Sequence, residues 1–262
     1  MIGHLSSLFE YRELLWILSL KEIKIRYKEA ALGVAWAILQ PLALMAIFTV
    51  IFSYFARLPS DGVPYPIFVF SALVPWTFFA SSLTSAISSL ERNAGLITKI
   101  YFPREIFPLA AILGASIDFA IAFLLFIGML VFYKVSPTLN ILFFFPIVFI
   151  QVTLMAGISL FLAGVNVFYR DVRFVIPLAL QVWMFASPVI YPVSLVPEKW
   201  RAFYMLNPMA GIIDSYRRAL LQGVPPELKY LGYSLFIAGI LLTLSYWFFK
   251  KIEMLMADEM GS

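Results

Sequence analysis

Six long apolar runs constrain this chain more than any other feature of its sequence. They cover residues 32–55, 66–90, 106–132, 140–168, 174–196 and 230–249. Asp118 is the only acidic or basic residue inside them. As a helix, the 24 residues of the first run would extend about 36 Å, enough to cross ~30 Å of hydrocarbon. One such run could be a buried core helix, but six cannot all be. The sequence therefore predicts an all-α integral membrane protein with six transmembrane helices.

Composition agrees with a membrane solvent and excludes several kinds of chemistry. Hydrophobic residues make up 62% of the 262 and charged residues 13%, whereas soluble domains have roughly 45–50% and about 25%. There is no cysteine and one histidine, His4, which excludes disulfides, thiol catalysis, imidazole metal clusters and Ser-His-Asp triads. No GxxxxGK[S/T] loop occurs, so the chain does not bind and split ATP by that motif. We therefore predict neither an enzyme nor a metal site.

Basic residues set the predicted orientation, because cytoplasmic loops of membrane proteins carry an excess of Lys and Arg. With the N-terminus inside, twelve of the 19 basic residues are cytoplasmic. The two short outer loops hold only Arg57 and Lys134, and the last outer connection, 197–229, holds the other five. Both termini are therefore expected in the cytoplasm.

Two segments outside the six runs are predicted to lie at the membrane surfaces. Residues 1–30 contain an alternation of apolar and charged residues over 6–28, with four basic residues at its end. This pattern indicates an amphipathic helix in the cytoplasmic interface, or alternatively a solvated helix packed on a partner. The apolar face of that helix contains Leu8, Leu14, Leu15 and Leu18.

The outer connection 197–229 predicts two short re-entrant or interfacial helices. An aromatic patch comes first, the pair Asn207-Pro208 breaks it, and an amphipathic stretch resumes over 209–221. The patch consists of Trp200, Phe203, Tyr204, Met205 and Leu206. Pro188 and Pro192 should loosen the outer end of the fifth run just before it.

The inner connection 91–108 is short, basic and patterned. Its apolar residues recur at helical spacing on one face, and its charged residues fall elsewhere. A plain membrane turn needs no such face. The segment is therefore expected either to be held by another protein or to lie flat on the lipid headgroups.

Three stretches resemble the membrane subunit of ABC-2-type polysaccharide exporters, with the O-antigen branch most similar. They are IKIRYKEAALGVAWAILQPL (23–42), NAGLITKIYFPREIFPL (93–109), and NVFYRDVRFVIPLALQVWMFASPVIYP (166–192) followed by LNPMAGIIDSYRRALLQG (206–223). The resemblance implies that 1–262 is one transmembrane domain. It implies a homodimer bound to two copies of an ABC ATPase, which would bind the ATP and Mg. Its substrate would be a lipid-linked polysaccharide crossing the bacterial inner membrane, with teichoic acid, capsule or another amphiphile as the alternative. Membrane lipids are expected contacts, and nucleic acid is not.

The resemblance also implies a coupling helix over 91–105, seated in a cleft of the ATPase. Its apolar knob and charged rim would be Arg92, Leu96, Ile97, Lys99, Ile100, Tyr101 and Arg104. The second inner turn, with Tyr169, Arg170, Asp171 and Arg173, is either another ATPase contact or a charge cluster that fixes topology.

Aromatic faces suit a polysaccharide path, because sugar C–H faces stack on them without one fixed hydrogen-bond pattern. The resemblance places the first and fifth runs around this path. Candidate lining residues are Trp36, Gln40, Phe48, Phe52, Phe55, Gln181, Trp183, Phe185 and Tyr191. Alternatively, these rings face lipid or pack between helices. A lipid pyrophosphate could enter at Lys24, Arg26, Tyr27 and Lys28, since four basic residues fall within eight positions there.

Asp118 is expected to hydrogen-bond a neighbouring helix rather than to relay protons, because no other ionisable residue is predicted at its depth. Gln151 and Ser159 are the candidate partners. Two other functional classes need features of their own. A lipid-modifying membrane enzyme needs clustered acids, bases or metal ligands, and an ion-driven carrier typically shows internal symmetry and buried charges. The sequence displays neither pattern.

Overall fold

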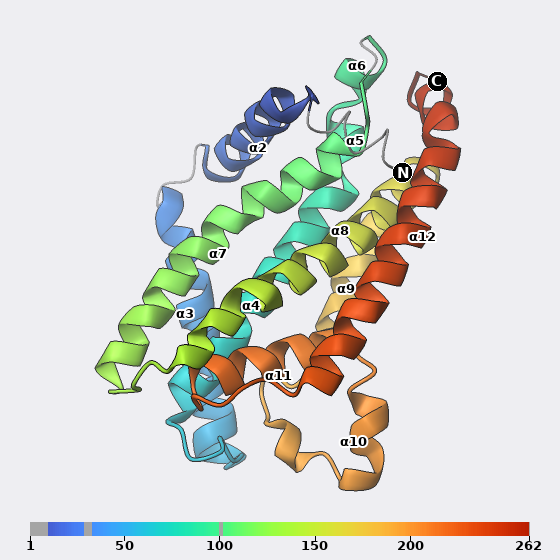
Figure 1. Cartoon of the computed structure of the whole chain (residues 1–262). Coiled ribbons are helices and arrows are strands. Elements are labelled where there is room, and N and C mark those ends of the chain that lie inside the picture. Colours follow the sequence, from blue (N-terminus) through green and yellow to red (C-terminus); the bar gives the residue numbers. More distant parts are fainter. Residues whose placement is uncertain (1–9, 29–32, 100–101, 262) are drawn as a thin grey trace.

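The computed structural model describes residues 10–28, 33–99 and 102–261, and the regular structure in these ranges is helical (Figure 1). The α-helices are α2 (Arg12–Tyr27), α3 (Trp36–Phe48), α4 (Tyr65–Ile87), α5 (Ser89–Arg92), α6 (Ala94–Ile97), α7 (Ile106–Phe132), α8 (Phe144–Phe168), α9 (Val172–Phe185), α10 (Glu198–Tyr204), α11 (Pro208–Leu220) and α12 (Leu228–Gly261). Shorter helical segments are the 3-10 turns η1 (Gly33–Ala35), η3 (Leu139–Phe143) and η4 (Val193–Leu195) and the π-helix η2 (Thr49–Phe55). The predicted all-α membrane fold is confirmed.

Within the described ranges, five helical stretches are long and apolar enough to cross a membrane. They are Trp36–Phe55, Tyr65–Ile87, Ile106–Phe132, Leu139–Phe168 and Leu228–Glu253. Each corresponds to one of the predicted runs, and the third agrees at both ends.

The predicted fifth span, 174–196, needs correction. Its helix α9 ends at Phe185 after 14 residues, which is about 21 Å and shorter than ~30 Å of hydrocarbon. Pro188 comes three residues after the last helical residue, and a proline offers no N–H to continue the helix. The chain then proceeds as turns to η4. The loosening was predicted, but the loss of helix over the whole second half of the run was not.

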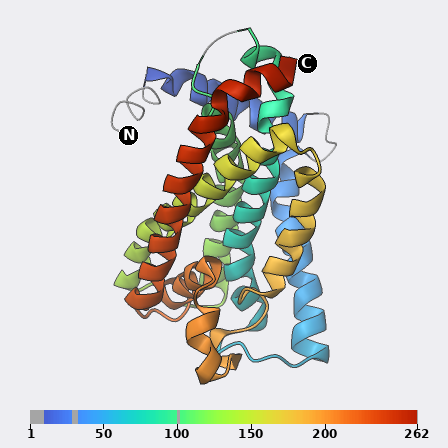
Figure 2. The ribbon, with the colours of Figure 1, turned by 90° about the vertical axis from the view of Figure 1, so that its right-hand side faces the viewer.

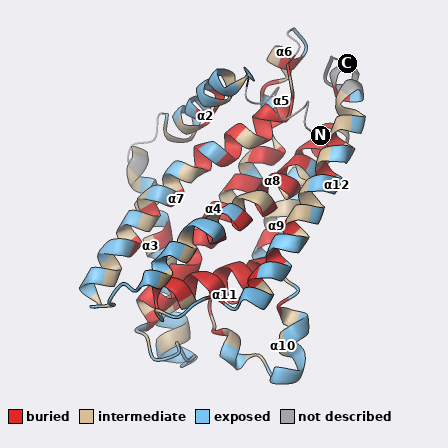
Figure 3. Ribbon diagram, viewed as in Figure 1, coloured by how far each residue is buried: buried red, intermediate tan, exposed pale blue. Residues whose placement is uncertain are grey.

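The helices form a bundle with α4 at its centre. α4 packs against α3, α7, α8, α9 and α11, and most of its length is buried, as are much of α8 and α11 (Figure 3). The exposed side chains of α3, α7 and α12 are largely apolar. Such apolar surfaces suit contact with the hydrocarbon of a membrane. A protein surrounded by water would show polar groups there instead.

The two ends of the bundle differ. α2, α5, α6 and the last turns of α12 lie at one end, and α10 and α11 lie at the other (Figure 1). Viewed from the side, α12 runs nearly the full height of the bundle (Figure 2). The segments with the predicted cytoplasmic basic residues therefore share one end.

α2 packs along α7. A Cβ added at Gly114 would lie 3.0 Å from Glu22 Cβ, so the glycine permits this close approach. Leu14, Leu15 and Leu18 face an apolar cluster, as the sequence pattern predicted. The predicted start of the helix, including Leu8, lies outside the described residues.

The first span is not a uniform α-helix, because its outer half is the π-helix η2, where Ala56 N–H donates to Ile51 C=O over 2.9 Å. Phe48, Phe52 and Phe55 have the i, i+4, i+7 spacing of one α-helical face, but they do not share a face in the structure. Phe48 is buried in the core with Phe52 packed against it, whereas Phe55 is 78% exposed. The wider π turn changes the angle between successive residues, so α-helical spacing no longer holds.

Candidate functional site

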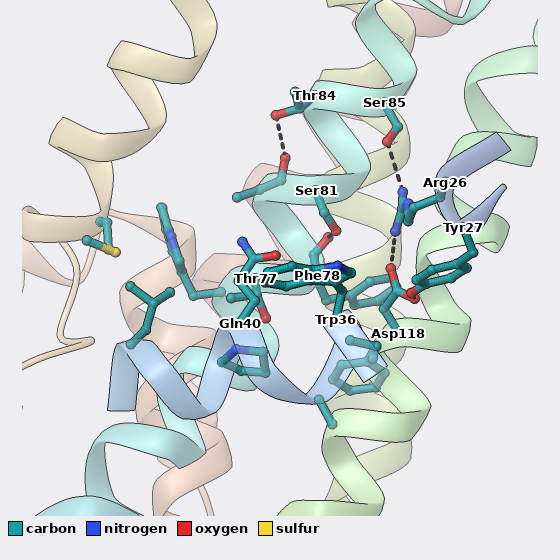
Figure 4. Close-up of a pocket in the computed structure, with 18 residues that line it drawn as sticks. Arg26, Tyr27, Trp36, Gln40, Thr77, Phe78, Ser81, Thr84, Ser85 and Asp118 are labelled. Carbon is teal, nitrogen blue, oxygen red and sulfur yellow. Dashed lines mark hydrogen bonds and ion pairs between the residues drawn. The ribbon is translucent and has the colours of Figure 1, made fainter. Parts of the chain in front are cut away.

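A groove of about 530 Å³ opens between α2, α3, α4 and α7 (Figure 4). We call it the inner groove. Its polar lining residues are Arg26, Tyr27, Gln40, Thr77, Ser81, Thr84, Ser85 and Asp118. Its aromatic lining residues are Trp36, Trp76, Phe78 and Phe119. Mixed aromatic and hydroxyl surfaces of this size are typical of small-ligand sites.

The hydroxyl side chains come from one face of α4. Thr77, Ser81 and Ser85 recur every four residues, which places them above one another along the helix. Phe78 stacks on Phe119 with ring centroids 4.7 Å apart, so aromatic surface lies beside the hydroxyl row. The sequence prediction missed this row, although its helical spacing inside an uncharged run was visible.

Asp118 is the charged residue on the α7 side of the inner groove. Its carboxylate accepts hydrogen bonds from Arg26 Nη1 and from the Tyr27 hydroxyl. Arg26 Nη2 donates to Ser85 Oγ over 2.9 Å. Both terminal nitrogens of the guanidinium are thus engaged, and the two sides of the Arg26–Asp118 pair are each about three-quarters buried.

The predicted partners of Asp118 are therefore wrong. Gln151 instead donates to Pro75 C=O over 2.8 Å and accepts from the Tyr216 hydroxyl over 2.9 Å. Ser159 Oγ is buried without a hydrogen-bond partner among the described residues. The expectation of no other ionisable group at this depth also fails, because α2 lies along α7 and a long arginine side chain reaches Asp118 from it.

Tyr27 lies outside the spans and remains a hydrogen-bond donor. Burial, followed by the hydrogen bond to the Asp118 carboxylate, raises the pKa of its hydroxyl well above the usual value. Of the other predicted entrance residues, Lys24 and Lys28 are exposed on α2. The structure thus brings Arg26 and Tyr27 together with Trp36 and Gln40 but leaves the two lysines outside the inner groove.

Some of the remaining predicted path residues gather at the opposite end of the bundle. A cavity of about 620 Å³, the outer pocket, is lined by Trp183, Ala186, Val196, Trp200, Phe203, Tyr204, Leu206 and Asn207. Trp183 Nε1 donates to Asn207 Oδ1 over 2.9 Å, and the Tyr204 hydroxyl donates to that of Tyr191 over 3.2 Å. Gln181 and Phe185 are exposed on α9. The outer pocket lies between α9, α10 and the residues just before α11.

The helix predicted over 91–105 is two single turns, α5 and α6, joined at Asn93. Leu96 is half-buried, and Arg92 and Lys99 are exposed. Ile97 is only 5% exposed, because it packs into the chain's own apolar cluster, so it cannot act as an exposed knob. Ile100 and Tyr101 lie outside the described residues.

Two of the predicted rim residues have partners within the chain. Arg92 pairs with Glu22 over 2.9 Å. Arg104 is buried, and its backbone N–H donates to Glu253 Oε1 over 3.1 Å. Arg104 therefore holds the start of α7 against α12, and its side chain is not part of an exposed rim.

The second inner turn lies next to the first. Arg170 and Arg173 approach the Glu91 carboxylate at 3.9 and 3.8 Å, while Tyr169 is exposed. These weak, partly solvated pairs link the two inner connections.

Most of the chain is similar to known membrane transport proteins. Residues 13–221 match the family described as ABC-2 type transporter. The chain is similar to an O-antigen export system permease protein RfbA of Klebsiella pneumoniae, with 32% identity over 88% of each chain. It is 30% identical to the protein of the same name from Myxococcus xanthus, over 87% of each chain. It is also 27% identical to a polysialic acid transport protein KpsM of Escherichia coli, over 82% of this chain and 84% of that protein.

Proposed function

We propose, because this chain belongs to the ABC-2 type transporter family, that it is the permease subunit of an ATP-driven polysaccharide exporter. It is a multi-pass protein of the bacterial inner membrane, and its proposed cargo is a lipid-linked, O-antigen-like polysaccharide. The observation that carries this proposal is the similarity to O-antigen export permeases, which extends over nearly nine-tenths of both chains. Capsule-like export is the second candidate, since similarity to the polysialic acid transport protein is present but lower.

The proposed energy source is a separate ABC ATPase, with two copies on a homodimer of this chain and with ATP and Mg bound by the ATPase. The supporting observation is an exposed surface at the end of the bundle that carries the predicted cytoplasmic basic residues. It contains the exposed residues Lys99, Tyr169 and Arg170 together with the half-buried Leu96. This surface has the mixed apolar and charged character expected of a docking site.

The proposed entrance for the lipid phosphate is Arg26 and Tyr27, with Lys24 and Lys28 beside them. Arginine suits phosphate oxygens because its planar fork can make paired hydrogen bonds. Sugar units would then pass aromatic and amide groups such as Trp36 and Gln40, and leave near Trp183 and Tyr191. The inner groove and outer pocket support this route, since both combine ring faces with a few polar groups.

Docking of the ATPase can be tested by charge insertion. Leu96→Asp combined with Lys99→Glu should reduce the amount of ATPase that co-purifies with the tagged chain by about tenfold, because it puts a carboxylate in place of an apolar side chain and reverses the charge of Lys99 in the proposed contact. Lys134→Glu makes the same lysine change on an exposed residue at the other end of the bundle and should leave co-purification intact. Ile97→Asp is unsuitable, since a buried charge there would destabilise the fold.

Export itself is read out as polysaccharide on the cell surface. Cells in which the double variant replaces the normal chain should lose surface polysaccharide and accumulate it inside. Full co-purification and full export by the double variant would contradict the proposed docking surface.

A further inference from the structure

We propose that Asp118 is a specificity-determining residue at the entrance, which keeps singly charged phospholipid headgroups off Arg26 and Tyr27. Only a headgroup with two or more negative charges, such as a diphosphate, would displace it. This inference rests on the proposed function, because it concerns selection at the same entrance.

The geometry carries the argument. The Asp118 carboxylate accepts from both Arg26 and Tyr27, the two predicted entrance residues that line the inner groove. Arg26 uses its other terminal nitrogen on Ser85. An anion that approaches the groove therefore meets a guanidinium already satisfied by a carboxylate. It can bind there only by replacing that carboxylate.

Of the basic residues at this end of α2, Arg26 is the one for which Asp118 and an incoming anion would compete. Lys21 donates to Asn93 Oδ1 over 2.7 Å, and Glu22 pairs with Arg92, so the preceding turn of α2 is tied to the chain. Lys24 and Lys28 are exposed and add general attraction for anions at the membrane surface. Among these side chains, Arg26 is the cation that lines the inner groove.

Phospholipid headgroups would compete with a diphosphate for Arg26, and this competition explains why a residue that excludes them is needed. The cytoplasmic leaflet is rich in anionic lipids, and each exposed Lys or Arg gains about 1 kcal/mol from that surface. An uncompensated arginine would therefore be occupied by ordinary phospholipids. A monoanionic phosphate offers about the same charge as Asp118 and gains little by replacing it. A diphosphate carries more charge and more acceptor oxygens, so it can satisfy Arg26 and Tyr27 together. Specificity of this kind comes from a built-in competitor.

The test is equilibrium binding of farnesyl diphosphate to the full chain in nanodiscs, made of phosphatidylcholine alone or with added phosphatidylglycerol. For the wild-type chain, phosphatidylglycerol should weaken binding only slightly. For Asp118→Asn, binding should be about tenfold tighter in phosphatidylcholine, because the competing charge is gone. The same variant should lose most of that gain when phosphatidylglycerol is present. Asp118→Ser removes the same carboxylate and should show both changes as well.

Asp171→Asn is the matched control, since it removes the same charge from an exposed residue outside the groove. It should behave as the wild-type chain. If Asp118→Asn and Asp118→Ser keep both wild-type affinities while Arg26→Gln abolishes diphosphate binding, the proposed entrance is supported and the selection by Asp118 is wrong. If Arg26→Gln also binds normally, the proposed entrance itself fails. Should Asp118→Asn not fold, Asp118→Ser decides between these outcomes.

Discussion

Arg217 on α11 is a buried cation whose partners are mainly backbone carbonyls. It is 3% exposed, and it donates to the carbonyls of Pro188, Val189 and Tyr191, the last two over 2.7 and 3.2 Å. Its guanidinium also lies 3.7 Å from the centre of the Phe68 ring. Burial lowers the pKa of Arg217 to about 10, so it keeps its charge at neutral pH. It therefore holds the turns that replace helix after Phe185.

Arg217→Lys should destabilise the protein by about 2–4 kcal/mol, because an ammonium cannot reproduce the planar fork that reaches several carbonyls. Thermal unfolding of the purified chain measures this as a melting temperature lowered by several degrees. Arg218→Lys is the matched control, since Arg218 is partly exposed and pairs with Glu227 over 3.2 Å. That change should cost less than about 1 kcal/mol. Equal effects of the two substitutions would refute the role assigned to Arg217.

At the residue scale, the sequence indicates which side chains are unusual better than it indicates which side chains they contact. It singled out Arg26, Tyr27 and Asp118, whose side chains are in contact in the structure, but Arg26 and Asp118 are 92 positions apart. Nothing local relates them, since their contact depends on how α2 lies on α7. The prediction that Ile97 is part of an exposed apolar knob was wrong for a related reason. Its spacing marks an apolar face, and periodicity alone does not say whether that face meets a partner or the chain's own core.

Among the helices, α8 and α12 form the most extensive pair. A Cβ added at Gly157 would lie 2.7 Å from Leu242 N, and one added at Gly164 would lie 3.0 Å from Ile252 Cδ1. Glycines on one helix let the two backbones approach closely, and close packing replaces the hydrophobic effect where lipid is the solvent. α12 also packs against α11 at the other end of the bundle.

Gly157→Ala should push α12 away from α8, because the obstacle is backbone and cannot rotate aside. We expect a loss of about 1–3 kcal/mol, partly offset by the higher helix propensity of alanine. Gly239→Ala on α12 is the control, since a Cβ there meets nothing within 4 Å. It should be neutral or slightly stabilising. Unfolding in detergent measures both, and a Gly157→Ala protein as stable as the control variant would contradict the close packing.

The sequence predicted helix boundaries well where an apolar run is also free of residues that disfavour helical backbone. The run 106–132 coincides with α7 because no proline or charge cluster interrupts its interior. The run 174–196 is also uncharged, yet α9 stops at Phe185. Pro188 cannot continue the helix, and a buried arginine 32 residues beyond Phe185 supplies hydrogen bonds to the non-helical backbone that follows. A hydropathy pattern cannot distinguish carbonyls satisfied by a helix from carbonyls satisfied by such a side chain.

Across the whole molecule, polar links tie the ends of helices that are far apart in sequence. At the end with α5 and α6, Lys250 donates to the buried Glu105 over 2.8 Å, and Glu253 accepts from Arg104. At the other end, Asn207 donates to Ser187 Oγ over 2.9 Å. A push on the inner connections would therefore be passed to α12 as well as to α4 and α7. The overall helical architecture was predictable from hydropathy, but these links required the three-dimensional arrangement.

Orientation across the membrane is the property on which the proposed coupling depends, and single cysteines can test it because the chain contains none. Thr98, next to α6, and Ser136, between α7 and η3, are both exposed and lie at opposite ends of the long helix α7. The distribution of basic residues places Thr98 in the cytoplasm and Ser136 outside. A membrane-impermeant maleimide added to intact cells should label Ser136→Cys and leave Thr98→Cys unlabelled until the membrane is opened. The reverse pattern would put the inner connections outside the cell, where no ATP-driven partner could reach them, and would remove the basis for coupling to an ATPase.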